Sequence, residues 1–368
     1  MRRAVIVLPT YNEAGNISTI IDSILAITKN LANWDIEILV VDSHSPDKTG
    51  EIVKELQQKN KHLHLIEVPK EGLGKAYTTG FTYAIEKLKA FTIFEMDADG
   101  QHDSKEIPNF LKQIEQGADF VIGSRYIKGG SIPKDWGVDR KFFSIIGNLI
   151  IRLGFMKLSI TDWTGGYRCI KTWVIKDAKT HIQPYTGYVF QIALLDYALK
   201  NKAVIKEIPV HFQERNHGES KISSGRYMYD ILWYIFQESS FIKFVIVGGL
   251  GFVLDFGISY VLIEIMRQAV WVATLISTES AIISNFVLNN AWSFAHKSIE
   301  NSRSSFVSSL LKFNLISSGS ILIQTLGVAL ASRFFGPNLW YIYKIVIIFF
   351  IIIPYSYVLY NKVIWKDK

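Results

Sequence analysis

The chain has 368 residues, of which 49% are hydrophobic and 20% are charged, and its formal net charge is +7. This mixture suits neither a single soluble globule nor a pure bundle of membrane helices, and the length leaves room for two domains. The Lys and Arg residues are spread out, which favours a basic surface facing a membrane and makes nucleic acid an unexpected partner. Cys169 is the single cysteine, which excludes an intrachain disulfide and favours a reducing compartment.

The first half of the chain alternates short apolar runs with segments whose apolar residues recur three and four positions apart. We predict buried strands at Ala4–Leu8, Ile36–Val41, Leu63–Val68, Phe91–Met96 and Phe120–Ile122. We predict helices between them at Asn16–Thr28, Thr49–Lys59, Gly74–Leu88 and Lys105–Glu115. Apolar strands that alternate with helices indicate an α/β fold with a doubly wound, largely parallel sheet. The first run is too short for a signal peptide, so we expect this domain to stay where it is made.

Polar side chains follow four of these strands at the point where each strand ends. They lie in Pro9–Glu13, Asp42–Asp47, Asp97–Gln101 and Ser124–Arg125. In open parallel sheets, ligands bind at the carboxyl ends of the strands. The sequence therefore predicts a ligand site at this edge of the sheet.

The segment Asp97–Gln101 is the sharpest of these signals. Asp97 and Asp99 follow a buried strand directly, and Gln101 offers a further oxygen two residues later. Mg²⁺ and Mn²⁺ take carboxylate oxygens together with the phosphates of a ligand. A metal at this site would bridge a diphosphate and neutralise a leaving group. The plain alternative is an acidic turn without a metal.

The ends of the first two strands offer groups that could hold a nucleotide. Tyr11 could stack on a nucleobase, and Glu13 could accept a hydrogen bond from a ribose or a base. Asp42 closes the second strand. Each of these regions also has a structural interpretation, because Glu13 and Asp47 lie where they could cap the helices that follow.

The second half of the chain predicts four membrane-spanning helices, each near the length of about 20 residues that crosses a bilayer. They are Phe244–Met266, Val270–Trp292, Ser309–Phe335 and Leu339–Asn361. Lys243, the loop after the second span and the tail after the fourth are basic, so we expect the first half, this loop and the C-terminus to be cytoplasmic. A weak internal repeat predicts that the four helices form two parallel pairs.

Two further segments, Arg140–Met156 and Tyr227–Ile242, carry apolar and aromatic residues together with basic or polar ones. We predict that they lie in the membrane interface, although they could also be core helices of the first domain. We therefore divide the chain into a catalytic domain at 1–225, an interfacial amphipathic helix or linker at 226–242 and a transmembrane domain at 243–368.

Taken together, these motifs resemble the inverting glycosyltransferases of family 2, which have the GT-A fold, and most closely the dolichol- or polyprenol-phosphate mannose synthases. The second half resembles the GtrA-like transmembrane domain that some members carry. The matching pieces span about Val5 to Ile222 in the family's order, which makes the resemblance specific. They are Pro9–Glu13, Val41–Asp42, Ser45–Thr49, Gly72–Gly74, Glu95–His102, Ile122–Gly130, Gly165–Arg168, Gly187–Phe190, Glu214–Arg215 and Gly218–Lys221.

The resemblance implies transfer of one mannose from GDP-mannose to dolichyl or polyprenyl phosphate, with inversion and with Mg²⁺ or Mn²⁺. It implies that Asp99 and Gln101 bind the metal and that Arg125, Arg140 and Ser144 bind the acceptor phosphate. Asp97, Asp99 and Arg125 would be catalytic. The nucleotide-sugar would be bound by Pro9, Tyr11, Glu13, Val41, Asp42, Asp97, Ala98, Asp99, Arg215 and Lys221.

One residue departs from the family pattern. A second acid often follows the acid at the base-reading strand end, and here Ser43 stands in its place. This departure weakens the prediction of which base, and so which sugar, the protein binds. A transferase that uses a UDP-sugar, such as a polyprenyl-phosphate glucosyltransferase, therefore stays open as an alternative. A lipid-linked sugar flippase or membrane scaffold is a second alternative, because Asp255 and Glu279 are acids inside predicted spans and such acids can mark a transport path. The sequence does not indicate an oligomeric state.

Overall fold

The computed structural model describes residues 1–368 except 30, 134–135, 214–223, 298, 300–302 and 367–368. The chain divides into two compact units, Met1–Tyr234 and Ile235–Lys368. This division falls inside the segment 226–242 that we predicted as a linker. The predicted domain boundaries themselves stay a prediction.

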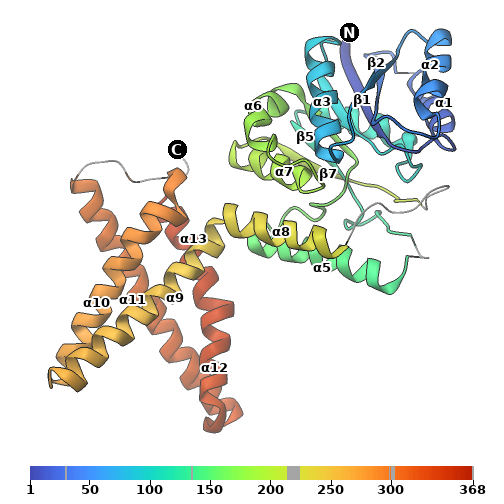
Figure 1. The fold of residues 1–368 in the computed structure, drawn as a ribbon. Helices are drawn as coiled ribbons and strands as arrows, with labels where there is room; N and C mark the ends of the chain where they lie inside the picture. The colour runs from blue at the N-terminus through green and yellow to red at the C-terminus, as the bar shows by residue number, and fades with distance from the viewer. Residues whose placement is uncertain (30, 134–135, 214–223, 298, 300–302, 367–368) are drawn as a thin grey trace. The chain divides into compact units, whose positions relative to one another are not determined.

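The first unit is built around a seven-stranded sheet of order β3-β2-β1-β4-β6-β5-β7 (Figure 1). All neighbouring strands are parallel except that β6 runs antiparallel to β4 and β5. The five predicted strands are confirmed, and two short strands, β6 and β7, were not predicted. The strands are β1 (Arg2–Thr10), β2 (Trp34–Asp42), β3 (Leu63–Glu67), β4 (Thr92–Glu95), β5 (Phe120–Ser124), β6 (Arg168–Lys171) and β7 (Ile205–Pro209).

Helices cover both faces of this sheet, as a doubly wound α/β fold requires. On one face, apolar side chains of α1, α2 and α4 join those of alternate strand residues in one core. On the other face α3 packs against β1 and β2, and Gly80 permits a close approach, since a Cβ there would lie 2.7 Å from Val7 Cγ1. These helices are α1 (Ile17–Thr28), α2 (Thr49–Lys59), α3 (Leu73–Glu86), α4 (Ile107–Glu115, preceded by the 3₁₀ turn η1, Ser104–Glu106), α6 (Thr172–Ile182) and α7 (Phe190–Lys200).

Two further helices, α5 (Val138–Gly154) and α8 (Ser224–Glu238), correspond to the two segments predicted to lie in the membrane interface (Figure 1). The second predicted segment is shorter than expected, because the Ser239 side chain accepts a hydrogen bond from Ile242 N and caps a new helix. Both helices expose large apolar side chains: Val138, Phe142, Ile145, Leu149 and Leu153 on α5, and Tyr229, Leu232 and Trp233 on α8. Five such residues at helical spacing on α5 form a continuous apolar face.

Among its described residues, the second unit contains four helices that are long and apolar enough to cross a membrane, as predicted. Three of them contain a short π-helical stretch. In chain order, the spans are α9 (Ser240–Tyr260) with η2 (Val261–Ile265), α10 (Val270–Leu288) with η3 (Asn289–Ser293), α11 (Arg303–Phe335), and α12 (Trp340–Ile347) with η6 (Ile348–Ile352) and α13 (Ile353–Val363); the 3₁₀ turns η4 (Ala295–Lys297) and η5 (Pro337–Leu339) lie between spans.

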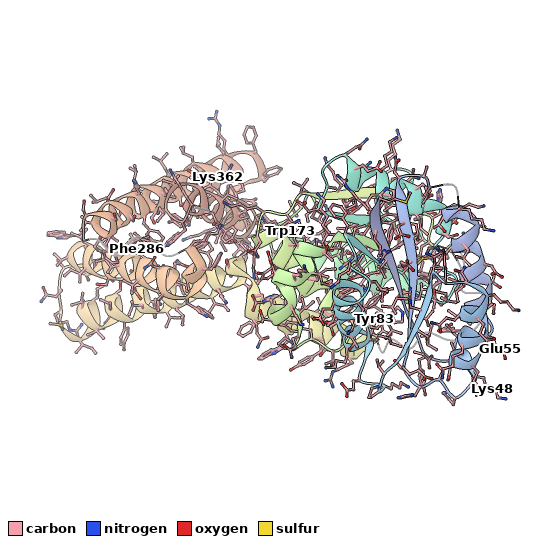
Figure 2. The ribbon with its side chains drawn as sticks, turned by 90° about the horizontal axis from the view of Figure 1, so that it is seen from above. Lys48, Glu55, Tyr83, Trp173, Phe286 and Lys362 are labelled. Carbon is pink, nitrogen blue, oxygen red and sulfur yellow. The ribbon has the colours of Figure 1, made fainter. Side chains whose placement is uncertain are left out.

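Aromatic rings of the second unit pack together around Phe286, which contacts Phe313 and Trp365. Figure 2 labels Phe286 and Lys362 among the side chains of this unit. Phe294 stacks on Trp365 with centroids 4.4 Å apart, and Phe313 stacks on Tyr360 at 4.3 Å. Lys297 Nζ also donates to Asn361 Oδ1 over 2.9 Å. The loop after the second span and the C-terminal segment therefore lie at the same end of the unit, as the distribution of basic residues requires.

Candidate active site

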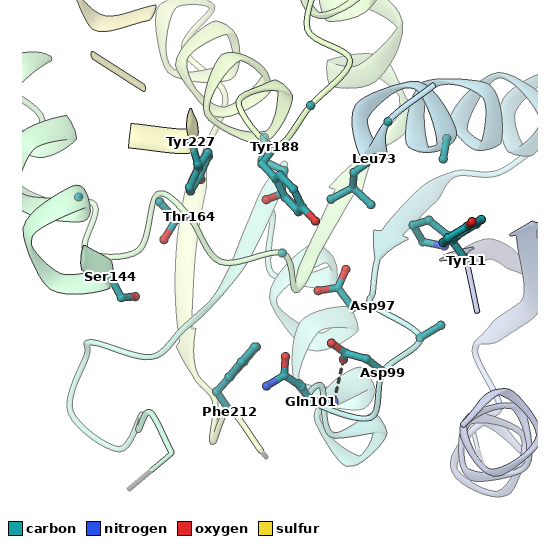
Figure 3. A pocket seen from close by; sticks show the side chains of 18 of the residues that line it. Tyr11, Leu73, Asp97, Asp99, Gln101, Ser144, Thr164, Tyr188, Phe212 and Tyr227 are labelled. Carbon is teal, nitrogen blue, oxygen red and sulfur yellow. Dashed lines mark hydrogen bonds between the residues drawn. The ribbon is translucent and has the colours of Figure 1, made fainter. Parts of the chain in front are cut away.

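A pocket of about 590 Å³ lies in the first unit, where β1, β4 and β5 end (Figure 3). Its lining brings together ten of the residues expected to bind donor, acceptor or metal. These are Pro9, Tyr11, Glu13, Asp97, Ala98, Asp99, Gln101, Arg125, Arg140 and Ser144. Side chains that are up to 135 residues apart in the sequence therefore share one cavity, as expected for the carboxyl edge of such a sheet.

The turn after β4 holds the acidic wall of the pocket. Figure 3 shows Asp97, Asp99 and Gln101 directing their polar ends toward one part of the cavity. Gln101 N donates to Asp99 Oδ1 over 3.0 Å, and Gln101 Nε2 donates to Gln213 O over 3.1 Å. These bonds fix the turn and orient the Gln101 amide, while Asp99 is 5% exposed.

His102 supports the same turn from behind. Its Nδ1 accepts a hydrogen bond from Asp97 N over 3.0 Å, and its ring stacks on Tyr167 with centroids 4.8 Å apart. Burial lowers the pKa of His102 to about 4, so the imidazole is neutral at physiological pH. A neutral ring that accepts at Nδ1 carries its proton on Nε2.

These side chains form a suitable donor set for a divalent cation. Asp99 and Gln101 supply carboxylate and amide oxygens, which hard cations such as Mg²⁺ and Mn²⁺ prefer, and no sulfur or imidazole nitrogen competes among the described residues of this wall. Asp99 is almost fully buried and lines the pocket, so its carboxylate borders the cavity. The residues present therefore fit the expected metal.

Arg125 also lines the pocket and is held by a residue that we did not predict. Its Nε and Nη2 donate to the two carboxylate oxygens of Asp162, each over 2.7 Å, and Nη2 also donates to Thr164 Oγ1 over 2.9 Å. Burial alone would lower the pKa of Arg125, but the charge of Asp162 and the hydrogen bonds to it together outweigh burial and raise that pKa. The guanidinium therefore stays charged in a fixed orientation.

Arg140 and Ser144 reach the pocket from α5. The Arg140 guanidinium lies 3.9 Å from the ring centroid of Trp136, and its side chain is exposed. Ser144 Oγ shares a hydrogen bond with Tyr126 Oη over 2.5 Å. Arg125, Arg140 and Ser144 thus supply two positive charges and a hydroxyl to one cavity, an arrangement suited to phosphate.

The end of β1 forms the far wall of the pocket. Lys70 Nζ lies 3.5 Å above the ring centroid of Tyr11, a cation–π contact between two pocket-lining residues. Glu13 Oε2 accepts from Asn16 Nδ2 over 2.9 Å, which ties Glu13 to the start of α1. Ser43, the residue that departs from the family pattern, also lines the pocket.

Two predicted nucleotide-sugar contacts, Val41 and Asp42, are not brought to the pocket wall, and two more are not among the described residues. Val41 and Asp42 are buried and do not line the cavity. The Asp42 carboxylate instead accepts hydrogen bonds from Thr10 Oγ1 over 2.8 Å and from Ser45 Oγ over 2.6 Å, and so links the ends of β1 and β2. Arg215 and Lys221 lie outside the described residues. All four assignments stay predictions.

A buried ion pair adjoins the pocket, because Arg168 donates to the main-chain oxygen of Gln191, a lining residue. Arg168 Nε is 3.8 Å from Glu95 Oε2, and the same guanidinium donates to the main-chain oxygens of Trp163, Gly165 and Gln191 over 2.6–2.8 Å. Burial raises the pKa of Glu95 to about 7. Arg168 therefore fixes the main chain at Trp163 and Gly165, in the loop that also carries Asp162.

Sequence reasoning missed several residues of this site, including Asp162, Thr164, Trp136 and Lys70. Asp162 and Arg125 are 37 residues apart, and Asp162 lies in a loop without a periodic pattern, so no local signal connects them. The available signal was indirect: Asp162 precedes the Gly165–Arg168 motif, and a buried arginine requires a counterion.

Comparison with known proteins agrees with this geometry. The model of glycosyl transferase family 2 matches residues 5–177, and the model of the GtrA/DPMS transmembrane domain matches residues 243–365. The second match and the four apolar helices make the chain an integral membrane protein.

Three curated relatives are similar over most of their own lengths. Polyprenol monophosphomannose synthase of Mycolicibacterium smegmatis is 35% identical over 61% of this chain and 82% of that protein. Dolichol-phosphate mannosyltransferase of Pyrococcus furiosus is 31% identical over 86% of this chain and 87% of that protein. Undecaprenyl-phosphate mannosyltransferase of Micrococcus luteus is 33% identical over 61% of this chain and 88% of that protein. The chain therefore is a glycosyltransferase that belongs to family 2 and, within it, to the polyprenol- and dolichol-phosphate mannose synthases.

Proposed function

We propose that this enzyme transfers a single mannose from GDP-mannose to a polyprenyl or dolichyl phosphate, with inversion, at the cytoplasmic face of the membrane. The names of the three relatives support mannose as the sugar and a polyprenyl phosphate as the acceptor. The observation that carries the proposal is one pocket with an acidic, metal-compatible wall at Asp97–Gln101 and a basic wall at Arg125 and Arg140.

The proposed donor spans the floor of the pocket from β1 to the turn after β4. In this proposal Tyr11, Glu13 and Ser43, which line the pocket, bind the nucleoside, and Asp97 contacts the sugar and the diphosphate. Mg²⁺ or Mn²⁺ held by Asp99 and Gln101 would supply charge neutralisation of the diphosphate leaving group. The departure at Ser43 keeps a UDP-sugar as the alternative donor to be tested.

The proposed acceptor needs orientation more than activation, because a phosphate monoester is already an anion at neutral pH. Arg125 is pre-oriented by Asp162, and Arg140 and Ser144 add donors from α5, so these side chains can direct the acceptor oxygen toward the sugar. Direct displacement on an α-linked donor inverts the anomeric centre, and we therefore propose a β-linked product.

The lipid tail of the acceptor requires an apolar surface next to its phosphate site. Ser144 lines the pocket, while Ile145 and Leu149 on the same helix belong to the exposed apolar face. A helix with one apolar face can lie in the membrane interface. We therefore propose that α5 is interfacial and that a lipid-bound phosphate enters along it.

Asp99→Asn tests the proposal, because it keeps the shape of the side chain and removes the carboxylate charge. We expect product formation to fall at least about 100-fold at saturating Mg²⁺ or Mn²⁺, since loss of such electrostatic stabilisation costs roughly 2.7–4 kcal/mol. Asp103→Asn is the matched control: Asp103 caps η1 through Lys105 N, does not line the pocket, and Asn caps equally well. Metal-dependent turnover in Asp99→Asn at the rate of Asp103→Asn would refute the metal assignment.

A further inference from the structure

The pair α9 and α10 with its continuation η3 carries a row of polar side chains inside the membrane-spanning unit. Asn285, Asn289 and Ser293 follow one another at intervals of four residues, so they lie along one face of the helix. Each has a buried oxygen, Oδ1 or Oγ, with no hydrogen-bond partner among the residues that the structure describes. Asn289 and Ser293 are each only 1% exposed.

The opposing helix explains why these oxygens have no partner. α9 packs against both α10 and η3, and its buried residues are Phe244, Val247 and Gly251, none of which has a side-chain donor. Gly251 lies directly against Asn285, because a Cβ there would come 2.2 Å from Asn285 Oδ1. Main-chain donors of α9 are occupied within the helix, so α9 cannot satisfy the row.

The row continues in the same helix pair as a hydrogen-bonded group. Asp255 Oδ1 accepts from Ser277 Oγ over 2.6 Å and from Thr278 Oγ1 over 3.3 Å, and Ser259 Oγ donates to Ser277 Oγ over 2.7 Å. Ser277 lies 16 residues before Ser293, which is about 24 Å along a helix and most of the roughly 30 Å hydrocarbon core. We call Asn285, Asn289 and Ser293, together with Asp255, Ser259 and Ser277, the polar seam.

Three buried acceptors without donors are costly in a membrane, where each unsatisfied group costs several kcal/mol because no bulk water is present. Packing of α9 against α10 without water leaves this cost in place, because the three oxygens form no hydrogen bonds to the opposing helix. A small molecule that donates hydrogen bonds does remove it, and water is the smallest. η3 is also π-helical, a distortion that is frequent at functional sites.

We propose that the polar seam binds water that enters from the Ser293 end and extends past Asn289 and Asn285 toward Asp255. Ser293 is the last residue of its span and so the seam residue nearest to the end of the helix, where water would pass beside the stacked rings of Phe294 and Trp365. The inference is independent of the transferase reaction: it gives the membrane-spanning unit a hydrated interior path where composition alone indicates an apolar anchor.

Cysteine accessibility in lipid bilayers tests this inference. The chain has one native cysteine, Cys169, which is fully buried and whose thiol pKa is raised by burial, so the unmodified protein supplies a low background. Ser293→Cys, Asn289→Cys and Asn285→Cys would be reconstituted in proteoliposomes and treated with a small, water-soluble methanethiosulfonate reagent. Val287→Cys is the matched control, because Val287 lies on the same helix between Asn285 and Asn289 and is 45% exposed on its outer face.

We expect each seam thiol to react at least about tenfold faster than the Val287→Cys thiol, because reaction requires a hydrated thiolate. We also expect the rates to fall in the order Ser293, Asn289, Asn285. Seam thiols that react no faster than the Val287→Cys thiol would show a dry seam and overturn the inference. A monodisperse elution profile in detergent, matching that of the unsubstituted protein, identifies variants that fold. Ser293→Cys and Ser277→Cys exchange only oxygen for sulfur and keep the test decisive if an asparagine variant does not fold.

Discussion

The two arginines of the pocket are held in different ways, and this difference predicts what each substitution does. Arg125 is buried against Asp162, so its removal would leave an unpaired buried carboxylate and destabilise the fold. Arg140 is exposed and contacts Trp136, so its removal costs little stability. Arg140 is therefore the residue at which phosphate binding can be tested without unfolding the protein.

We predict that Arg140→Ala raises the KM for polyprenyl phosphate about 10- to 100-fold and leaves the KM for the donor nearly unchanged. The expected size follows from a hydrogen bond to a charged group, about 1.5–3 kcal/mol. Steady-state kinetics with each substrate varied in turn measures both constants. Arg152→Ala is the control, because Arg152 is on the same helix, bonds Leu158 O and does not line the pocket. Equal rises in both KM values for Arg140→Ala would contradict its role at the acceptor.

His102 makes a second prediction at the residue scale, on stability against pH. Its folded pKa of about 4 lies below the unfolded value of about 6.5, so protonation favours the unfolded chain. Its contribution is fully present above pH 6.5 and is lost as the pH falls toward 4. The loss is on the order of 3 kcal/mol, from roughly 2.5 pKa units at 1.36 kcal/mol each.

Comparing the protein with His102→Gln isolates this contribution. Glu95, whose pKa is raised to about 7, acts in the opposite direction between about pH 4.5 and 7 but is common to both proteins. We expect the free energy of unfolding of the unsubstituted protein to fall more steeply between pH 6.5 and 4 than that of His102→Gln. Parallel curves in denaturant titrations across this range would show that His102 is not the group responsible.

At the scale of single elements, the apolar face of α5 is expected to guide the lipid acceptor. We predict that Ile145→Glu raises the KM for a long-chain polyprenyl phosphate roughly tenfold, since it removes about 1.5–3 kcal/mol of apolar burial in the interface. The KM for a short, water-soluble alkyl phosphate should not change. Val204→Glu is the control, because Val204 is 47% exposed, close to the 48% of Ile145, and precedes β7 rather than lying on α5. A rise with both acceptors would argue against an interfacial role.

Elements whose apolar residues recur at regular intervals could be predicted from the sequence, and elements fixed by residues far away in the chain could not. The five apolar strands and α1 to α4 follow from patterns inside each segment. Strand β6 could not be predicted in this way, because it has only four residues and begins with a charged one. Arg168 is buried there because main-chain carbonyl groups and Glu95, which lie outside the strand, surround its guanidinium. For the same reason Asp97, Asp99 and Arg125 were found at strand ends, whereas Asp162 was not. The end of α8 was misplaced because a single cap, Ser239, decides it.

At the scale of the whole molecule, chemistry and anchoring belong to separate units. Every residue that lines the pocket lies in Met1–Tyr234, and the four spans lie in Ile235–Lys368. An acceptor that is itself a lipid is confined to the bilayer, so an enzyme anchored there meets it at a high local concentration. The membrane unit thus serves the reaction as an anchor, and the proposed polar seam adds a hydrated path within it.

The mass of the product tests the central claim most directly. The full chain in detergent would be incubated with polyprenyl phosphate, Mn²⁺ or Mg²⁺ and an equimolar mixture of GDP-mannose, UDP-glucose and UDP-galactose in which each sugar carries a different isotope label. The account predicts one product, the lipid phosphate plus a single hexose with the mannose label, and none when the metal is chelated. A product with a label from a UDP-sugar, or the mannose product formed without metal, would contradict it.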